Sequence, residues 1–574
     1  MRRVLPWALL AGLVFLVSFS ILLAATRIYQ VDECQYIYMA RVLCANQGST
    51  FFTDASGFTL PLSWLDGLNP QSIAVFTRAR FVMVGILWLN LVLIALCTGE
   101  KLVSRGGAIA LLGAATLAPL WDYGFEIRHD NVLLTGLLLM WFVLRVRPRG
   151  SQSYFIAGAI AVGLQFFAFK AFAYTAPLSL ACLVFPPPAH KLVRWKLILA
   201  WIAGAIVSFL GARLLYGSLG LWEVYLTDLH GISGASVHTK RLLPWTTLAR
   251  LFSQTPLLLA SSLAALVVAG SELWRNRRAA LNWDGNLPEA LLFLGAFGVL
   301  LVNPNPYPYN LLQVVPFAFI FAFRYAKRVA TVVLDRPGLL PACVCILIFV
   351  HLVPFWTATQ RHLNRTNTRQ EHLMVLAESL TDPNLDPVYD AIGMVPSRPS
   401  IDFRWFLHSL NIQSFTEGPG RRVRDLLTAR PAAVFIPSYR TDWLTEEDHA
   451  FIRERYVPLA DDFWVLGKVL PAGGGAFEII HPGRYRLAPL QASELVGSCT
   501  NLANCLMTST DQPRLSGKLD GTPLAGQVLQ LSAGTHQLET SAGIEPAIVW
   551  VGPRLDRIPA LEPRSHNALF VNWY

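Results

Sequence analysis

Long apolar runs separated by short polar segments dominate the first 360 residues of the chain. A helix needs roughly 20 apolar residues to cross a bilayer. The runs therefore predict about eleven membrane-spanning helices, at 5–26, 80–97, 106–121, 131–145, 153–169, 172–186, 196–216, 251–273, 287–302, 309–326 and 338–358. The two runs that flank Lys170 could instead form a single broken helix.

Basic clusters lie at the N-terminus and in every second loop between these predicted helices, so they all fall on one side of the membrane. They contain Arg2 and Arg3, then Lys101 and Arg105, then Arg145, Arg147 and Arg149, then Lys191, Arg194 and Lys196, then Arg275, Arg277 and Arg278, and finally Arg324, Lys327 and Arg328. Because loops rich in Lys and Arg stay in the cytoplasm, the N-terminus is predicted to be cytoplasmic. The loops at 121–130, 217–250 and 303–309, together with Asp32, Lys170 and the C-terminal region, then share the opposite, periplasmic face.

The pattern changes after residue 360, where the chain becomes charged and rich in proline. Residues 361–472 combine a helical pattern at 445–456 with short strand-like runs, which predicts a small α/β domain. Residues 473–574 form short alternating runs between Gly and Pro turns, which predicts a β-sandwich. The predicted fold is thus a polytopic α-helical membrane domain over 1–360 with an extracytoplasmic α/β plus β-sandwich region.

The composition supports this assignment. The 574 residues are 53% hydrophobic and only 15% charged, and the mean hydropathy is +0.43. These values are typical of an integral membrane protein with membrane lipids as partners. The net charge of +10 would suggest nucleic acid in a soluble protein, but the basic clusters follow the membrane topology, so no nucleic-acid partner is predicted. The first apolar run lacks a clear cleavage site and is interpreted as a retained helix.

The chain has eight cysteines. Six of them lie in or near the apolar runs, where cysteine commonly packs as a small apolar residue. Cys499 and Cys505 lie close together in the predicted periplasmic region, and an oxidising compartment favours a local disulfide between them. The cysteine spacing matches no zinc motif.

The stretch from Val31 to Arg41 directly follows the first apolar run and begins with two adjacent carboxylates, Asp32 and Glu33. Acidic side chains at a membrane boundary are costly and often functional. If the stretch is helical, Asp32, Tyr36 and the residues at 35 and 39 share one face while Glu33 points elsewhere. The alternative is an ordinary helix start, since acids favour the first turn.

Two further places on the same face carry charge. Arg128 and Asp130 lie at the head of the fourth predicted span, where Asp130 could bind substrate or simply cap the helix. Lys170 interrupts an apolar stretch and needs a partner such as a phosphate, unless its side chain snorkels to the interface.

Two loops complete the candidate site. The 217–250 loop contains Lys240 and Arg241, which could cover an anionic group, although an ordinary polar loop would look the same. The prolines of 303–310 impose extended geometry and present Tyr307 and Tyr309 at headgroup depth. Aromatic residues are ordinary there, but these two could also bind a lipid-linked substrate. Carboxylates, including Asp54, and cations on one membrane face suit transfer from a phosphate leaving group: a base takes the acceptor's proton and fixed cations stabilise the departing phosphate.

Four stretches together resemble the C-type membrane glycosyltransferases, in particular the bacterial branch related to protein O-mannosyltransferases and aminoarabinose-to-lipid-A transferases. They are Val31–Tyr36, the loop from Phe51 to Leu65 with Arg78 and Arg80, the stretch Ile127–Asn131, and the segment from Gly158 to Lys170. The likeness covers about residues 1–360. The chain differs from these relatives in two places. It has Cys34 where they often have a small residue or Gly, and it lacks the His-Pro-Pro run that they commonly have at 59–62.

The resemblance implies an inverting enzyme of the bacterial inner membrane that uses a polyprenyl-phosphate-linked sugar. Asp32 matches the catalytic base and Glu33 the second acid, while Arg128 and Lys170 match the contacts to the donor phosphate. The acceptor would be a hydroxyl of an envelope glycan, lipid or protein. The sequence identifies no certain cofactor and leaves a divalent metal open.

Two other functions are compatible with the sequence. A transporter or flippase of a lipid-linked sugar would use the cations but would not need a base. A binding or assembly protein would place its function in the β-sandwich, with the membrane part as a scaffold.

Overall fold

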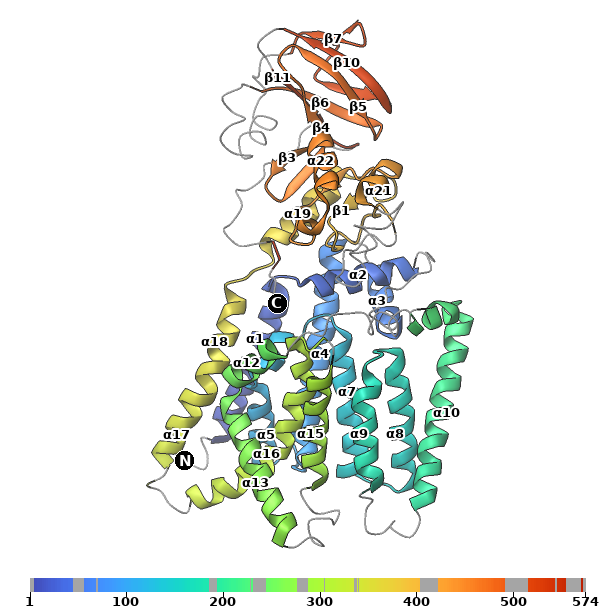
Figure 1. Ribbon diagram of the computed structural model, residues 1–574. Coiled ribbons are helices and arrows are strands. Elements are labelled where there is room, and N and C mark those ends of the chain that lie inside the picture. Colours follow the sequence, from blue (N-terminus) through green and yellow to red (C-terminus); the bar gives the residue numbers. More distant parts are fainter. Residues whose placement is uncertain are drawn as a thin grey trace.

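The computed structural model describes residues 5–44, 56–68, 71–184, 194–227, 229–230, 244–275, 287–303, 305–334, 338, 340–402, 422–490, 515–541, 545–553 and 569–570. A helical bundle forms one half of the molecule. A region of sheets and short helices, which begins at Thr368 and is called the upper region below, stands on one end of the bundle (Figure 1). The candidate site lies where these two halves meet.

Each of the predicted apolar runs overlaps one or more helices. The bundle helices are α1 (Leu5–Thr26), α4 (Ser72–Cys97), α5 (Arg105–Ala115), α6 (Ala118–Tyr123), α7 (His129–Trp141) with the π-helix η1 (Phe142–Val146), α8 (Ser151–Gly163) with the 3-10 turn η2 (Leu164–Phe166), α9 (Ala171–Val184), α10 (Arg194–Ser218), α12 (Trp245–Gln254), α13 (Pro256–Arg275), α15 (Leu287–Val302), η4 (Pro308–Asn310), α16 (Leu311–Leu334), α17 (Leu340–Ile346), η6 (Leu347–Leu352) and α18 (Val353–Leu363). The runs around Lys170 form two helices, α8 and α9, which lie side by side (Figure 1).

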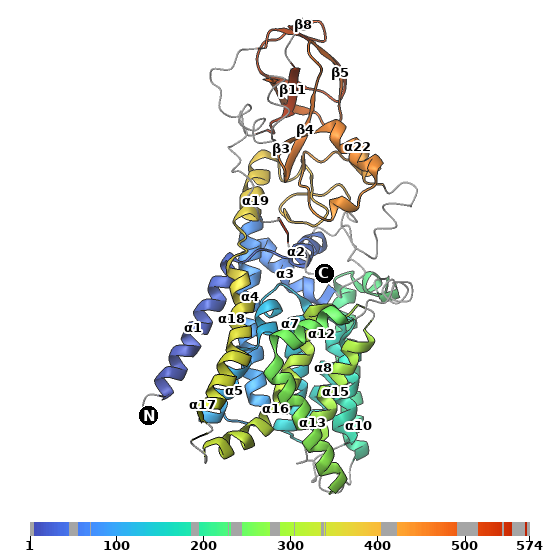
Figure 2. The ribbon, with the colours of Figure 1, turned by 60° about the vertical axis from the view of Figure 1, so that its left-hand side comes forward.

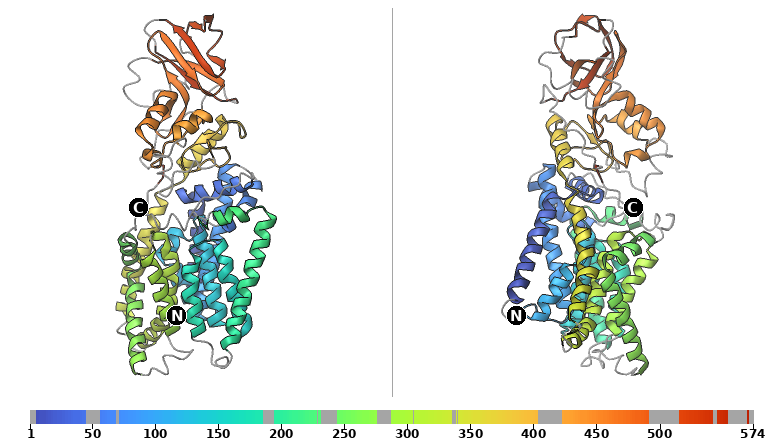
Figure 3. Two further views of the ribbon diagram at one scale, coloured as in Figure 1. Left: turned by 45° about the vertical axis from the view of Figure 1, so that its right-hand side comes forward. Right: turned by 90° about the vertical axis from the view of Figure 1, so that its left-hand side faces the viewer.

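The bundle has the surface of a membrane domain. Among the described residues, four helices are long and apolar enough to cross a bilayer: Ser72–Cys97, His129–Val146, Trp195–Ser218 and Pro256–Arg275. Shorter apolar helices accompany them at Leu10–Thr26, Arg105–Ala115, Ala171–Leu183 and Leu287–Val302. Helix α10, at one edge of the bundle (Figure 3), exposes apolar side chains such as Leu199, Val207 and Leu214. Apolar side chains on an outer face are stable in lipid, and the architecture is that of a polytopic α-helical membrane protein.

Two of the predicted spans differ from the helices that the structure contains. Helix α4 starts at Ser72, about two turns before the predicted position, and carries Arg80 fully buried. An arginine normally marks the end of an apolar run, but here a carboxylate partner allows it to lie inside the helix. The predicted span at 251–273 is divided into α12 and α13 at Pro256, because proline lacks the backbone N–H that a continuous helix needs.

Helices α2 (Val31–Cys44) and α3 (Ser56–Leu68) lie between the bundle and the upper region (Figures 1 and 2). The upper region begins with α19 (Thr368–Leu380), which docks on the bundle through hydrogen bonds. The backbone N–H of Tyr29 donates to Gln370 Oε1 at 2.7 Å, and that of Ser72 donates to Glu378 Oε1 at 2.8 Å. These contacts fix the upper region above α2.

The upper region contains two sheets, whose strands are β1 (Val388–Tyr389), β2 (Val434–Phe435), β3 (Tyr456–Ala460), β4 (Phe463–Val469), β5 (Gly474–Ile479), β6 (Gly483–Leu490), β7 (Gly517–Leu519), β8 (Thr522–Pro523), β9 (Val528–Leu531), β10 (Gly534–Thr540) and β11 (Glu545–Trp550). The short helices α21 (Val423–Ala429), η7 (Thr441–Trp443) and α22 (Glu446–Arg455) accompany them. The larger sheet has the order β1-β2-β4-β11-β6-β9 with β3 paired to β4, and the smaller has the order β5-β10-β7-β8.

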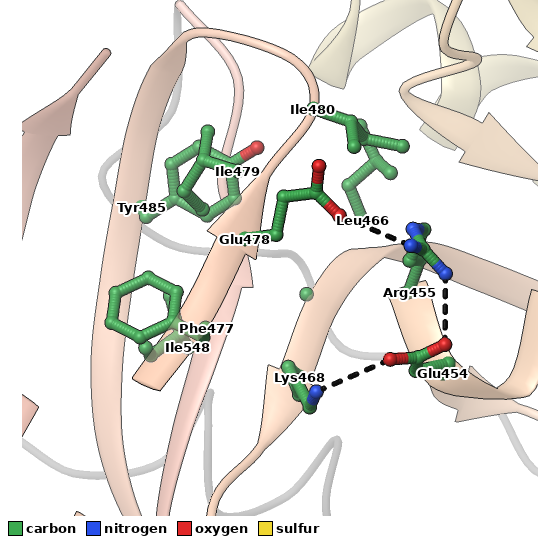
Figure 4. A pocket seen from close by; sticks show the side chains of 11 residues that line it. Glu454, Arg455, Leu466, Lys468, Phe477, Glu478, Ile479, Ile480, Tyr485 and Ile548 are labelled. Carbon is green, nitrogen blue, oxygen red and sulfur yellow. Dashed lines mark hydrogen bonds and ion pairs between the residues drawn. The ribbon is translucent and has the colours of Figure 1, made fainter. Parts of the chain in front are cut away.

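The larger sheet crosses the domain boundary predicted at residues 472 and 473, because β4 pairs with β11. The two units therefore share one sheet, and their division into separate domains stays a prediction. A crevice between the two sheets is lined by ion pairs, with Arg455 bonded to Glu454 at 2.9 Å and to Glu478 at 3.0 Å (Figure 4). Its aromatic residues, Phe477 and Tyr485, are buried.

Helices α8 and α10 pack through two glycines. A Cβ atom on Gly158 would lie 2.0 Å from the carbonyl oxygen of Trp201, and one on Gly204 would lie 1.9 Å from that of Phe155. Small residues let helices approach closely in a membrane, where van der Waals contact drives association. This contact holds α8, and with it the turn that carries Lys170.

We expect Gly204→Val to separate α8 from α10 and to lower the free energy of unfolding by about 1–3 kcal/mol, the usual cost of overpacking. Gly211→Val is the matched control, because Gly211 lies in the same helix and a Cβ there meets nothing within 4 Å. Thermal unfolding of the purified variants in detergent measures both. Equal stability of the two variants would contradict the packing assignment.

Candidate active site

The candidate residues come together at the end of the bundle that faces the upper region. Helix α2 supplies Asp32 and Tyr36, the start of α7 supplies Arg128 and Asp130, and the turn before α9 supplies Lys170. The segment around η4 adds Tyr307 and Tyr309. Several segments far apart in the sequence thus contribute to one place.

The start of α2 explains the division between the two adjacent carboxylates. The backbone N–H of Gln30, just before the helix, donates to Glu33 Oε2 at 2.8 Å. This is the backward contact of a capping box, in which the third helical residue holds the N-cap. Glu33 therefore starts the helix, while Asp32 points elsewhere, as the helical spacing predicted.

Glu33 is also part of a buried ion pair with Arg80. Arg80 donates to it twice, from Nε at 2.8 Å and from Nη2 at 2.6 Å, and both side chains are fully buried. The backbone N–H of Ile127 donates to the same carboxylate at 3.2 Å. Glu33 thus ties α2 to α4 and to the segment before α7. We assign it a positioning role, since no exposed surface remains for contact with a substrate.

A second buried pair shapes the segment that leads into α7. Arg27 donates to Glu126 Oε1 at 2.6 Å, and both side chains are at most 2% exposed. The amide of Asn131 donates to the carbonyl oxygens of Tyr123 and Glu126 at 3.1 and 3.0 Å. These bonds fix the backbone on both sides of Arg128.

Four charged side chains then alternate in sign. Arg128 Nη1 donates to Asp32, and Arg128 Nε lies 3.2 Å from Asp130 Oδ2. Lys170 Nζ pairs with the other oxygen of Asp130 and donates to Asn310 Oδ1 at 3.1 Å. Asp130 is fully buried, whereas the Asp32 side chain is 25% exposed. Asp130 holds the two cations from a buried position, whereas part of the Asp32 side chain remains accessible from outside.

Tyr309 supports both cations from one ring. Its centroid lies 3.7 Å from the Arg128 guanidinium carbon and 4.8 Å from Lys170 Nζ. Cation–π contacts of this kind are strengthened when the cation is desolvated. Tyr307 packs against it, with 5.6 Å between the ring centroids. The proline-rich turn thus holds the cations in position.

Tyr36 lies behind this group. Its hydroxyl shares a hydrogen bond with His129 Nδ1, and its side chain is buried. His129 Nε2 in turn lies 3.9 Å from Asp130 Oδ2. Tyr36 therefore orients the start of α7 rather than lining the opening.

A cavity opens beside Asp32 and Arg128, and its lining includes two residues that the sequence patterns did not identify. The lining residues are Gln30, Val31, Asp32, Tyr123, Glu126, Arg128, Pro308, Tyr309, Tyr439 and Arg440. Tyr439 and Arg440 belong to the upper region, about 300 positions away from Arg128. Arg440 is 6% exposed and stacks on Trp443, with its guanidinium carbon 4.5 Å from the ring centroid.

Arg128 carries a permanent positive charge. Burial alone would lower its pKa, but the carboxylates of Asp32 and Asp130 raise the pKa well above its ordinary value. The cavity therefore offers a fixed cation at any physiological pH, next to a partly exposed carboxylate.

Several predicted residues lie outside the described part of the chain. They are Asp54, Lys240, Arg241, Cys499 and Cys505. Their roles in substrate binding, phosphate binding and the disulfide stay predictions. Within the described ranges, no group of three or more His, Cys, Asp or Glu side chains could hold a metal ion.

Comparison with known proteins gives a fold but no sequence relative. No protein-family model matches the chain, and no curated protein is similar to it in sequence. The crystal structure of ArnT from Cupriavidus metallidurans in the apo state superposes with a TM-score of 0.53 at 12% identity, covering 81% of this chain and 98% of that one. The structure of the same protein bound to undecaprenyl phosphate superposes with a TM-score of 0.52 at 12% identity, covering 80% of this chain and 98% of that one. The chain therefore has the fold of these ArnT structures, in agreement with the fold that its motifs predicted.

We expect Glu33→Gln to lower the free energy of unfolding by about 3–5 kcal/mol, because it leaves Arg80 charged and buried without its partner. Glu100→Gln is the control, since Glu100 pairs with the 62% exposed Lys327 and such pairs contribute about 1 kcal/mol or less. Thermal unfolding in detergent compares the two. A Glu33→Gln protein as stable as the control would rule out the positioning role.

Proposed function

We propose that the chain is an inverting glycosyltransferase that moves a sugar from a polyprenyl-phosphate donor to a hydroxyl group of a cell-envelope acceptor. The observation that carries this proposal is the alternation of Asp32, Arg128, Asp130 and Lys170 beside a cavity. A partly exposed carboxylate next to fixed cations provides a base and a phosphate site within one structure. The ArnT structure with undecaprenyl phosphate, which has the same fold, supports a polyprenyl phosphate as the donor class.

In this proposal Asp32 is the general base. It accepts the proton of the acceptor hydroxyl while that oxygen attacks the anomeric carbon from the side opposite the phosphate. The bond between the anomeric carbon and the phosphate oxygen breaks, and its electron pair leaves with the phosphate. A single displacement of this kind inverts the configuration of the sugar.

Arg128 and Lys170 stabilise the departing phosphate, since fixed positive charge acts most strongly in a cavity that excludes water. In the free protein these cations are paired with Asp32 and Asp130. A phosphate that binds Arg128 takes over part of its bonding, which releases the carboxylate of Asp32 toward the acceptor. Donor binding would thereby activate the base.

Arg440 and Tyr439 line the same cavity from the upper region. We infer that they contact the acceptor or the sugar, because the cations of the bundle already serve the phosphate. A lipid, glycan or protein acceptor fits this arrangement. The charge pattern of the sequence supports a reaction on the periplasmic face of a bacterial inner membrane, with the N-terminus in the cytoplasm.

We expect Asp32→Asn to lower the rate of transfer by about 10²–10⁴-fold, the usual contribution of a general base. Affinity for undecaprenyl phosphate should remain. The assay uses purified protein in liposomes with labelled polyprenyl-phosphate sugars and follows the new glycoside. Asp442→Asn is the control, since Asp442 is an exposed carboxylate two residues after Arg440.

Two results would overturn the proposal. A fully active Asp32→Asn protein would remove Asp32 as the base. Movement of the labelled lipid across the liposome membrane without any new glycoside would instead identify a flippase.

We expect Lys170→Ala to weaken binding of undecaprenyl phosphate by about 10- to 100-fold, because a hydrogen bond to a charged group contributes about 1.5–3 kcal/mol. Lys170→Arg should retain most of the affinity, since it keeps the charge. Lys196→Ala, at an exposed position of α10, is the control and should bind normally. Titration of the purified variants with undecaprenyl phosphate measures this; unchanged affinity in Lys170→Ala would place the phosphate elsewhere.

A further inference from the structure

A second charged cavity lies at the opposite end of the bundle. The segment His129–Val146 starts at the candidate active site and ends at this cavity, and its 18 residues extend about 27 Å as a helix. The cavity has a volume of about 430 Å³, within the roughly 300–1,000 Å³ of typical ligand pockets. It is lined by Leu96, Cys97, Gly99, Glu100, Lys101, Phe142, Arg145, Val146, Arg147 and Arg324.

Positive charge exceeds negative charge around this cavity. Four of the lining residues are basic and one is acidic. Arg145 donates to Glu289 from Nε at 3.0 Å and from Nη2 at 3.3 Å, and Arg324 Nη2 lies 3.1 Å from the same carboxylate. Two guanidinium groups therefore share one buried carboxylate. Lys101 and Arg147 are exposed beside them, so the lining attracts anions.

The backbone places Arg145 in this group. The last turn of the α7 segment is a π-helix, and the N–H of Arg147 donates to the carbonyl oxygen of Phe142 at 2.9 Å. Such turns are rare and frequently occur at functional sites. The Arg145 side chain is only 4% exposed. The rule that positive charge stays in the cytoplasm explains basic loops, but it does not require an arginine buried in a widened helical turn at a cavity.

We propose that this cavity binds a phosphate group, with Arg147, Arg324 and Lys101 as the contacts and the Arg145–Glu289 pair as their support. Basic pockets between membrane helices bind the headgroups of anionic lipids. The phosphate could belong to such a lipid or to a soluble phosphate compound. The site is separate from the one that holds the donor in the proposed function and does not depend on it.

The test uses purified full-length protein and two short-chain lipids, dioctanoyl-phosphatidylglycerol and dioctanoyl-phosphatidylcholine, with binding followed by native mass spectrometry. We expect the wild type to bind the anionic lipid at least tenfold more tightly than the zwitterionic one. Arg147→Ala combined with Arg324→Ala should weaken that binding about tenfold or more. Arg275→Ala is the control, an exposed arginine in the last turn of α13, and should stay within twofold of wild type.

Further variants keep the result interpretable. Arg147→Ala alone alters an exposed side chain and should fold normally, yet still lose affinity, and Arg147→Lys should restore it. Inorganic phosphate provides the second arm: displacement of the lipid at millimolar concentration, lost in the same variants, would support the site and indicate a soluble ligand. Equal binding of the anionic lipid by wild type and the double variant, or equal binding of both lipids, would overturn the proposal.

Discussion

The buried pair of Glu33 and Arg80 is the contact on which the site depends. A charge removed from water is costly unless a partner and further hydrogen bonds satisfy it. Here Arg80 donates to both oxygens of Glu33, and the N–H groups of Gln30 and Ile127 donate to the same carboxylate. One carboxylate thus connects the start of α2, the middle of α4 and the approach to α7. The positions of Asp32 and Arg128 follow from that connection.

The neighbouring group of ion pairs combines one buried carboxylate with one that is partly exposed. Asp130 is fully buried and holds Arg128 and Lys170, so the cations are positioned before any substrate arrives. Asp32 is partly exposed and keeps an oxygen available. Preorganised charge does not need to reorient during the reaction, which is why it stabilises a transition state more than water does. Two neighbouring acids, Asp32 and Glu33, therefore differ in role because they differ in burial.

The sequence predicted the bundle well because apolar length and basic loops are local signals. It also predicted that Asp32 and Glu33 diverge, because helical spacing separates adjacent residues. It misplaced the start of α4, since an isolated arginine reads as a boundary when its partner 47 positions away is unknown. It missed Tyr439 and Arg440 for a similar reason. The docking of the upper region on the bundle, through α19 among other contacts, brings them to Asp32, and no periodicity in the sequence encodes that docking.

That docking explains why the upper region belongs to the site and is more than an appendage. Two residues of the bundle bond to α19: Tyr29 lies just before α2, and Ser72 is the first residue of α4. These are the two helices that the pair of Glu33 and Arg80 joins. The upper region is therefore anchored to the elements that position Asp32. A displacement of these elements would move Asp32, the proposed base, together with Tyr439 and Arg440, which line the same cavity. Because a charged site acts most strongly where water is excluded, a cavity wall anchored next to Asp32 would serve the proposed transfer better than one anchored to the far side of the bundle.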